Sequence, residues 1–344
     1  MYARLAAAVR RFDEKFGWSW IGACLSVAII TAAAFVLYRN LRGINVREVV
    51  DAIRETEPRD VAIAACFVAA AYFTLTFYDL FALRTIGRRD VLYRIAALAG
   101  FTSYAIGHNV GASVFTGGAV RYRIYSARGL SAIEVAKLCF VAGLTFWLGN
   151  AAVLGLGISY APAAASAIDQ LPGWLNRVLA FLILLALGSY IGWVWSAPRE
   201  IGQAQWKVRL PSGPSTLVQI VIGLCDLGCC TMAMYMLLPN EPNIGFVTLL
   251  VVFVSATMLG FASHAPGGLG VFDAAMLVAL WQFQREDLVA GLLLFRVLYY
   301  LIPFVIALTI LGTRELLYVR STKAQLKSVR AADPLRSEIE REKT

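Results

Sequence analysis

The chain has 344 residues and a formal net charge of +9; 59% of its residues are hydrophobic, 15% are charged, and the mean hydropathy is +0.67. Soluble globular domains carry about 25% charged residues, so this composition excludes an ordinary soluble enzyme and indicates an integral membrane protein.

Apolar segments long enough to cross a bilayer recur along the chain. A hydrocarbon core about 30 Å thick requires about 20 apolar residues per helix. Six segments meet this requirement: 18–38, 61–83, 135–157, 174–195, 216–238 and 288–312. The first is too long, and lacks the small-residue cleavage site, to be a removable signal peptide. The sequence therefore predicts an all-α polytopic membrane protein with about six transmembrane helices.

Lys and Arg gather in alternate connections, as expected of cytoplasmic flanks. The basic segments are 1–17, 84–94, 121–137, 196–215 and the tail 313–344, whereas the loops 159–173 and 239–243 carry no Lys or Arg. We therefore expect both termini in the cytoplasm, with the tail along anionic lipid. Segment 39–60 balances five arginines with five acids, and its Val46, Val49, Val50 and Ile53 recur at helical spacing. That spacing predicts an amphipathic helix on the outer surface.

Two further apolar regions, 95–120 and 244–283, are interrupted by Gly, Pro and His. The first begins and ends beside cytoplasmic basic clusters, and its length of about 25 residues is too short for two crossings. We expect two re-entrant hairpins, entering from opposite faces. Irregular backbone at membrane depth occurs where it is buried in protein or lines a wet cavity, so the tips mark a cavity. The expected tip residues are Gly107, Gly111, Gly117 and Gly118 in the first hairpin and Pro266, Gly267, Gly268 and Gly270 in the second.

The order span, span, hairpin, span occurs twice, over 18–157 and 174–312. Asp79 and Asp226 occupy matching spans, and His108 and His264 occupy matching hairpins. The two copies have opposite predicted orientations. Such an inverted repeat is typical of transporters with a central site that is reached alternately from either side.

Polar residues inside these apolar regions are candidates for substrate binding, because a bare charge at the bilayer centre costs about 3 kcal/mol. The candidates are Asp79, His108, Asn109, Arg121, Asp226, His264, Asp273 and Arg296. The arginines suit phosphate, and the acids suit an ammonium group. Several alternatives stay open. Asp226 and Arg296 could form a structural ion pair, Asp79 could snorkel to the interface, and Arg121 could simply follow the positive-inside bias. The histidines could act as hydrogen-bonded caps of the hairpins, which is the role we favour for them.

Other chemistries find little support. All six cysteines, Cys24, Cys66, Cys139, Cys225, Cys229 and Cys230, fall inside the spans and are expected to act as small apolar residues. A phosphate-binding glycine loop, a nucleophile elbow and a zinc motif are missing from the sequence. We expect neither a metal nor another cofactor. Because the basic flanks account for the net charge, we expect no binding of nucleic acid.

Four stretches carry a family resemblance: "SYAIGHNVGASVFTGGAVRYRIYSARGLS" (103–131), "TFWLG" (145–149), "SHAPGGLGVFD" (263–273) and "LFRVLYYLIP" (294–303). The chain resembles the flippase half of the bacterial lysylphosphatidylglycerol synthase and flippase family, of the multiple peptide resistance factor type, and its stand-alone relatives. The resemblance implies a lipid translocase of the bacterial inner membrane. It would move aminoacylated phosphatidylglycerol, such as lysyl-phosphatidylglycerol, to the outer leaflet and protect against cationic antimicrobial peptides.

The same resemblance implies that the lipid-synthesising acyltransferase domain lies outside this chain, so we expect no enzyme activity. A separate lipid aminoacyltransferase and a second copy of the chain are the expected partners, besides phospholipid. Two other functions stay open: an ion-coupled transporter of a small polar solute, and a non-catalytic membrane subunit of a lipid-modifying system. A lateral opening between helices would favour lipid, and a closed vestibule would favour a solute.

Overall fold

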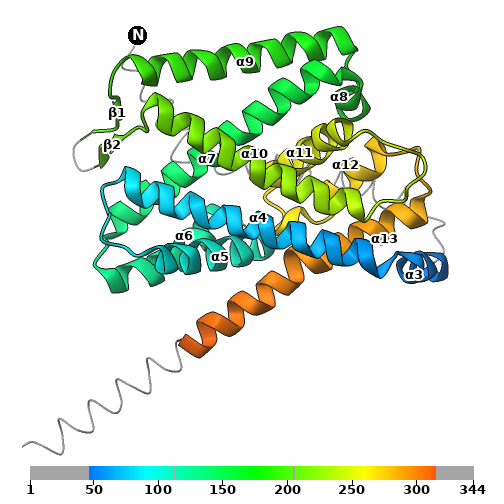
Figure 1. The fold of residues 1–344 in the computed structure, drawn as a ribbon, viewed down its shortest axis with the longest axis horizontal. Coiled ribbons are helices and arrows are strands. Elements are labelled where there is room, and N and C mark those ends of the chain that lie inside the picture. The colour runs from blue at the N-terminus through cyan, green and yellow to red at the C-terminus, as the bar shows by residue number, and fades with distance from the viewer. Residues whose placement is uncertain (1–45, 112, 204–205, 315–344) are drawn as a thin grey trace, which may run out of the picture.

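The computed structural model describes residues 46–111, 113–203 and 206–314, which form a bundle of helices with one small sheet (Figure 1). The predicted all-α membrane fold is confirmed for these residues. The expected span 18–38, segment 1–17 and most of the tail 313–344 lie outside the described residues.

Five helices in the described part of the chain are long and apolar enough to cross a membrane. They are α4 (Pro58–Thr85), α7 (Ala132–Tyr160), α9 (Gly173–Ser196), α10 (Gly213–Met236) and the continuous stretch Arg285–Arg314. The last begins as α13 (Arg285–Arg296) and contains a π-helical turn, η4 (Val297–Leu301). These helices cover the expected segments 61–83, 135–157, 174–195 and 288–312, and 216–238 except for its last two residues.

Local sequence sets the ends of these helices. Pro58 occupies the first turn of α4. Backbone N–H groups in the first turn have no partner within the helix, so the missing N–H of proline costs no hydrogen bond there. Ser131 and Glu134 form a reciprocal capping box at the start of α7. After α7, the short helix α8 (Pro162–Asp169) turns the chain toward α9. Gly129 ends the one-turn helix η1 (Ser126–Arg128) at φ 78°, a conformation that favours glycine.

The region 95–120 forms a helical hairpin. Helix α5 (Tyr93–Val110) ends at Gly111, whose φ of 83° reverses the chain into α6 (Ser113–Tyr125), and the two helices pack side by side (Figure 1). The turn therefore lies at Gly111. Gly107, Gly117 and Gly118 were also expected at the tip, but Gly107 lies within α5 and the other two lie within α6. A side chain on Gly117 would approach the Ser103 carbonyl oxygen to 3.2 Å, so this glycine permits the close packing of α5 and α6.

The region 244–283 is broken in a similar way. Helix α11 (Phe246–Ala262) and helix α12 (Val271–Ala279) are separated by the 3-10 turn η3 (Pro266–Gly268). Gly267, Gly268 and Gly270 adopt φ values of 60°, 60° and 79°. L-residues with side chains rarely adopt such values, so these glycines set the path of the break. Whether either hairpin enters and leaves a membrane on one face stays a prediction.

The two breaks meet each other. A Cβ atom added to Gly111 would lie 3.2 Å from Pro266 Cα, and one added to Gly267 would lie 3.4 Å from the carbonyl oxygen of His108. The tips of two segments from different halves of the chain are thus in van der Waals contact. The order long helix, two shorter helices, long helix occurs in both halves, as α4 to α7 and as α10 to α13; an inverted symmetry between them remains a prediction.

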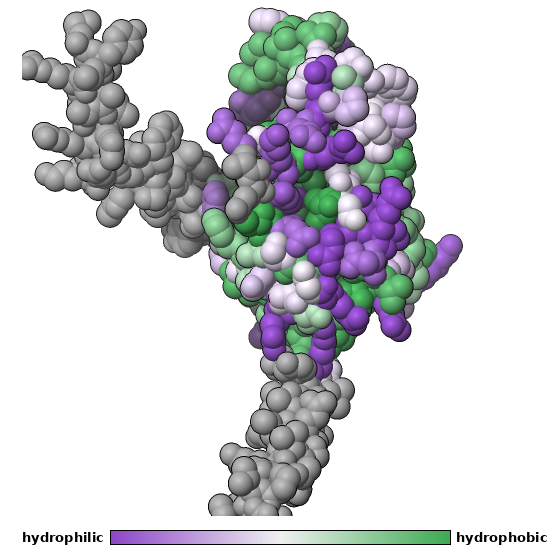
Figure 2. Space-filling view, turned by 90° about the vertical axis from the view of Figure 1, so that its left-hand side faces the viewer, coloured by the Kyte–Doolittle hydropathy of each residue, from purple (hydrophilic) through white to green (hydrophobic). Residues whose placement is uncertain are grey.

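The basic connections gather at one end of the bundle. Arg88 joins two of them, because its guanidinium donates to Glu134 Oε1 (2.9 Å), to Asp90 Oδ1 (3.0 Å) and to the carbonyl oxygen of Arg128 (3.0 Å). Figure 2 views this end of the molecule and shows hydrophilic side chains concentrated on it, with apolar surface around them. The segment 196–215 lies at the same end and forms a two-stranded sheet that the sequence analysis missed, β1 (Glu200–Ile201) with β2 (Val208–Arg209).

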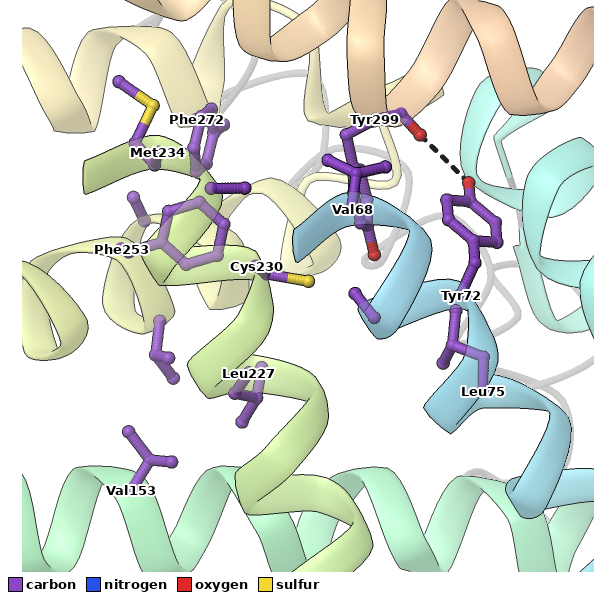
Figure 3. Packing of buried hydrophobic residues seen from close by; sticks show 14 of the residues in the cluster. Val68, Tyr72, Leu75, Val153, Leu227, Cys230, Met234, Phe253, Phe272 and Tyr299 are labelled. Carbon is purple, nitrogen blue, oxygen red and sulfur yellow. Dashed lines mark hydrogen bonds between the residues drawn. The ribbon is translucent and has the colours of Figure 1, made fainter. Parts of the chain in front are cut away.

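The core is centred on the packing of α4 against α10. Val68, Tyr72 and Leu75 from α4 lie near Leu227 and Cys230 from α10, with Phe253, Phe272 and Tyr299 contributed by the second half (Figure 3). Cys230 points into this packing, as expected of a small apolar residue. Gly149 of α7 and Gly223 of α10 approach so closely that a Cβ on Gly149 would lie 2.7 Å from Gly223 Cα.

Two helices lie at the margins of this core. The amphipathic segment expected within 39–60 includes a helix, α3 (Val46–Glu55), which packs against α13. Helix α9 runs along the edge of the bundle (Figure 1), and only 11% of its most apolar window is buried. Large apolar side chains of α9, such as Phe181 and Leu185, are therefore exposed.

Candidate functional site

Asp79 and Arg121 form a buried ion pair between α4 and α6. The Arg121 guanidinium donates from Nε to both carboxylate oxygens at 3.0 Å and from Nη2 to Oδ1 at 2.7 Å. The hydroxyl of Tyr125 donates to Oδ2 at 2.8 Å, and the Tyr104 ring lies 4.7 Å below the guanidinium. Asp79 is 0% exposed and Arg121 6%. Asp79 therefore does not snorkel to the interface, and Arg121 is not a surface charge.

Asp273 and Arg296 form a second ion pair, which is half-buried and lies beside the second break. Arg296 Nε donates to Oδ1 at 2.9 Å and Nη2 donates to Oδ2 at 2.6 Å. The backbone N–H of Gly270 also donates to Oδ2, and Arg296 Nη1 donates to the carbonyl oxygen of Gly267. This pair therefore connects α13 to both sides of the break. The alternative of an Asp226–Arg296 pair is wrong in this structure.

Asp226 is surrounded differently. It is 4% exposed in the middle of α10, and it accepts hydrogen bonds from the hydroxyl groups of Tyr78 (3.1 Å) and Thr74 (3.4 Å). The Cys230 thiol lies 3.9 Å away. Among the residues that the structure describes, no Lys, Arg or His forms a salt bridge with this carboxyl group.

Tyrosine rings connect these three acids into one cluster. Tyr78, which donates to Asp226, packs edge-on against Tyr104, which lies under Arg121. Tyr104 in turn contacts the His108 ring, with a centroid distance of 5.6 Å. His108 stacks on Tyr299 at 6.0 Å, and Tyr300 lies 5.4 Å from the Arg296 guanidinium.

His108 and Asn109 occupy the end of α5 within this cluster. Asn109 Nδ2 donates to the carbonyl oxygen of Tyr300 (3.0 Å), which joins the first hairpin to η4. His108 Nδ1 is buried and has no hydrogen-bond partner in the described part of the chain, so the hydrogen-bonded capping favoured from the sequence is wrong for this histidine. The structure thus brings together all of the predicted polar site residues except His264.

His264 lies apart from the cluster. Its side chain is exposed, its φ is 57°, and its Nδ1 lies 3.0 Å from the carbonyl oxygen of Ala262. This geometry is that of a residue closing the turn after α11, which is the capping role favoured from the sequence.

The sequence analysis included no tyrosine among the candidate site residues. Tyr125 donates to Asp79, while Tyr78 and Tyr104 lie between the buried acids. One signal was available, because Tyr125 follows Arg121 by four residues and such residues share a face of a helix. Nothing comparable in the sequence links Tyr78 to Asp226, which is 148 residues away.

An apolar groove of about 660 Å³ runs between α6 and α7, next to the Asp79–Arg121 pair. It is lined by Val114, Phe115, Gly118, Ala119, Tyr122, Ala132, Val135, Ala136, Cys139, Phe140, Gly143, Leu144 and Trp147. Phe115 is 80% exposed and Trp147 55%, so the groove opens sideways at the surface of the bundle. Cys139, which lines the groove, interacts with Arg121. The guanidinium group of Arg121 is therefore buried next to the apolar wall of the groove. In the described ranges, no group of three or more His, Cys, Asp or Glu could hold a metal ion.

No family model matches the chain. Its sequence is, however, similar to those of several proteins, including the following three. It is 30% identical over 314 residues to the uncharacterized protein slr0712 of Synechocystis sp., covering 91% of this chain and 96% of that protein. It is 27% identical over 297 residues to the inner membrane protein YbhN of Escherichia coli, covering 85% and 91%. It is 24% identical over 307 residues to phosphatidylglycerol lysyltransferase of Staphylococcus aureus, covering 87% of this chain but 35% of that enzyme.

Proposed function

We propose that this chain, which belongs to the family formed by stand-alone membrane proteins and by the membrane region of the phosphatidylglycerol lysyltransferases, moves phospholipid between the leaflets of the bacterial inner membrane. The substrate we propose is aminoacylated phosphatidylglycerol, such as lysyl-phosphatidylglycerol, carried from the inner to the outer leaflet. The name of the Staphylococcus aureus relative links that protein to phosphatidylglycerol and lysine. The chain matches about a third of it, so the proposal covers lipid movement and not lysyl transfer.

The apolar groove beside a buried ion pair is the observation that carries this proposal. A phospholipid needs an apolar path for its acyl chains and fixed charges for its head group, because a bare charge inside the bilayer costs about 3 kcal/mol or more. The groove between α6 and α7 supplies apolar walls that open sideways, and Arg121 and Asp79 lie behind it. Arg121 can release the Asp79 carboxylate and bind a lipid phosphate in its place. The Asp79 carboxylate can then bind an ammonium group of the lipid.

The contact between the two breaks supports an alternating mechanism. The tips at Gly111 and Pro266 touch, and an ion pair flanks each broken segment. In transporters built from two opposed repeats, one half rocks against the other around a fixed central site. We propose that the head group passes between the tips when they separate, held first by Arg121 and then by Arg296. The sideways opening of the groove favours lipid over a small solute.

Lipid movement in proteoliposomes tests this function. The purified protein is reconstituted with fluorescent lysyl-phosphatidylglycerol, and dithionite quenching reports the fraction in the outer leaflet over time. The double variant Asp79→Asn/Arg121→Gln keeps the shape of the buried pair without its charges. We expect it to slow lipid movement by at least about tenfold, the effect of losing about 1.4 kcal/mol of stabilisation.

Arg54→Gln is the matched control, because Arg54 is a 75% exposed arginine that pairs with Asp51 on α3. It should move lipid at the wild-type rate. A wild-type protein that moves no lipid would contradict the proposed function. Full activity of the double variant would contradict the assignment of the Asp79–Arg121 pair.

A further inference from the structure

We propose that Asp226 is a proton-binding residue whose protonation couples lipid movement to the proton gradient across the membrane. This inference rests on the proposed lipid translocation and adds an energy source to it. In each cycle one proton binds a carboxylate oxygen of Asp226 from the water on one side of the membrane and leaves to the water on the other side.

The contrast between Asp226 and the other two buried acids is the first support. Asp79 and Asp273 each accept hydrogen bonds from two nitrogens of an arginine, so each has a cationic partner. Among the described residues, the side chains that hydrogen-bond Asp226 are hydroxyl and thiol groups. A carboxylate buried without a cation is destabilised by the loss of its hydration. The neutral form is therefore favoured while the site is closed, and the charged form is favoured when water reaches it.

The groups around Asp226 leave it without a balancing charge. Those that interact with it are Tyr72 and Tyr78 from α4, Tyr104 from α5, Cys229 and Cys230 from α10, and Tyr299 from η4. The charged residues of α4 are Arg59, Asp60, Asp79 and Arg84, of which Asp79 pairs with Arg121. Helices α7, α9, α11 and α13 also pack against α10. Their charged residues are Glu134 and Lys137 in the first two turns of α7, Arg177 in the first two turns of α9, and Arg285, Glu286, Asp287 and Arg296 in α13; α11 has none.

A series of polar aromatic residues leads from Asp226 to the tips, which is the second support. Tyr78 donates to Asp226, Tyr104 packs against Tyr78, and His108 packs against Tyr104. The buried Nδ1 of His108 has no partner among the described residues, and His108 lies three residues before the turn at Gly111. Separation of the tips would expose this end of the series first. Protons would then reach Asp226 through the opening by which the head group leaves, so that the proton and the lipid move in opposite directions.

Proton binding changes which conformation is stable. A ligand shifts a two-state equilibrium by its difference in affinity for the two states. With the tips in contact, Asp226 is 4% exposed, whereas separated tips would let water reach its carboxyl group and favour the carboxylate. A proton gradient would therefore bias the direction of the cycle. With one proton moved per lipid, a gradient of one pH unit changes the equilibrium distribution of lipid between leaflets by up to about tenfold.

The test measures that distribution. Proteoliposomes containing fluorescent lysyl-phosphatidylglycerol are prepared with and without a gradient of one pH unit, and an internal pH dye records proton movement in the same vesicles. The wild-type protein is expected to shift the lipid distribution several-fold with the gradient, up to the tenfold limit. Asp226→Asn is expected to show the same distribution with and without the gradient. Asp51→Asn, which changes an exposed acid on α3, is expected to behave as wild type.

Tyr78→Phe keeps the test decisive if Asp226→Asn does not fold. It removes one hydroxyl that contacts the carboxyl group, so the pH midpoint of transport should move by about half a unit to one unit. Lipid movement by wild type without any response to the gradient overturns the proton proposal alone. A gradient response retained by Asp226→Asn, or an unmoved midpoint in Tyr78→Phe, overturns it as well. Absence of lipid movement by wild type overturns both the coupling and the proposed function.

Discussion

At the scale of single residues, two acids of the cluster, Asp79 and Asp273, each pair with one arginine, whereas Asp226 has no cationic partner among the described residues. Arg121 fits Asp79 with three hydrogen bonds, and Tyr125 supplies a fourth. Breaking a buried pair by removing one partner is strongly destabilising, because the remaining charge stays desolvated. Replacing both partners removes that penalty. The energy of the pair is therefore visible only when single and double variants are compared.

We expect Asp79→Asn to destabilise the protein by about 3–5 kcal/mol, because Arg121 is left buried without its partner. The double variant Asp79→Asn/Arg121→Gln should recover most of that loss. Thermal unfolding in detergent, followed by the retained monodisperse fraction, measures both. A double variant that is less stable than Asp79→Asn would show that the pair itself, and not the unpaired charge, carries the stability.

The stability that Arg88 adds by connecting the two basic loops should depend on pH. Hydrogen bonds from Arg88 hold the pKa of Asp90 below its ordinary value. A depressed pKa in the folded state adds stability above the pKa of the unfolded chain and loses it as the pH falls through the folded value. Wild type should therefore exceed Asp90→Asn in thermal stability at neutral pH. The difference should disappear in strong acid, and an equal difference at both pH values would contradict this.

At the scale of helices and hairpins, much of the arrangement could be predicted from the sequence. The long apolar segments gave the five membrane-length helices, since length and hydropathy alone define such a span. The glycine-rich stretches gave the two breaks, because positive φ at Gly111 and Gly270 requires glycine. The position of the first turn within 107–118 could not be predicted, because Gly117 permits the close packing of α5 and α6, and a packing glycine looks the same in the sequence as a turn glycine.

Side-chain pairings could not be predicted in this way. Asp79 and Arg121 are 42 residues apart, and Asp226 and Tyr78 are 148 apart. Their meeting depends on how α4 packs against α6 and α10, which local patterns do not encode. Sequence therefore identified the charged residues of the cluster but paired Arg296 with the wrong acid as its alternative. It also missed the sheet of β1 and β2, whose strands have two residues each.

The contact of α7 with α10 depends on two glycines. We expect Gly149→Ala to lower the thermal midpoint, because its Cβ would lie 2.7 Å from Gly223 Cα and the helices would have to separate. Gly188→Ala in α9 is the matched control, since nothing lies within 4 Å of an added Cβ there. It should be neutral or slightly stabilising, because alanine favours helix. Equal midpoints for the two variants would mean that the close approach is unimportant.

The tip contact can be separated from backbone strain. Gly111 and Gly129 have similar φ values of 83° and 78°, but only Gly111 has a close neighbour, Pro266. Both variants should lose stability through strain, Gly129→Ala by about 1–2 kcal/mol in the left-handed helical region and Gly111→Ala by about 1–3 kcal/mol in a region that is almost restricted to glycine. Gly111→Ala alone should also slow lipid movement, because its methyl group disturbs the junction of the tips. The same transport rate in both variants would remove the tip contact from the mechanism.

At the scale of the whole molecule, three features coincide: basic loops at one end, two broken segments that touch in the middle, and an apolar groove that opens sideways between α6 and α7. A membrane protein needs none of these merely to be stable. Together they describe a path in which lipid tails stay in an apolar environment while the head group crosses a polar cluster. The groove is where this account places the lipid.

Photo-crosslinking with a phospholipid that carries a reactive group on its acyl chain tests this placement most directly. Labelling should concentrate at Phe140 and Trp147 in the groove, and unlabelled lysyl-phosphatidylglycerol should reduce it there. The exposed apolar face of α9, at Phe181 and Leu185, provides the internal control, because bulk lipid should label it without competition. Labelling that is equal on the two surfaces, or that the competitor reduces on neither, would contradict the lipid path.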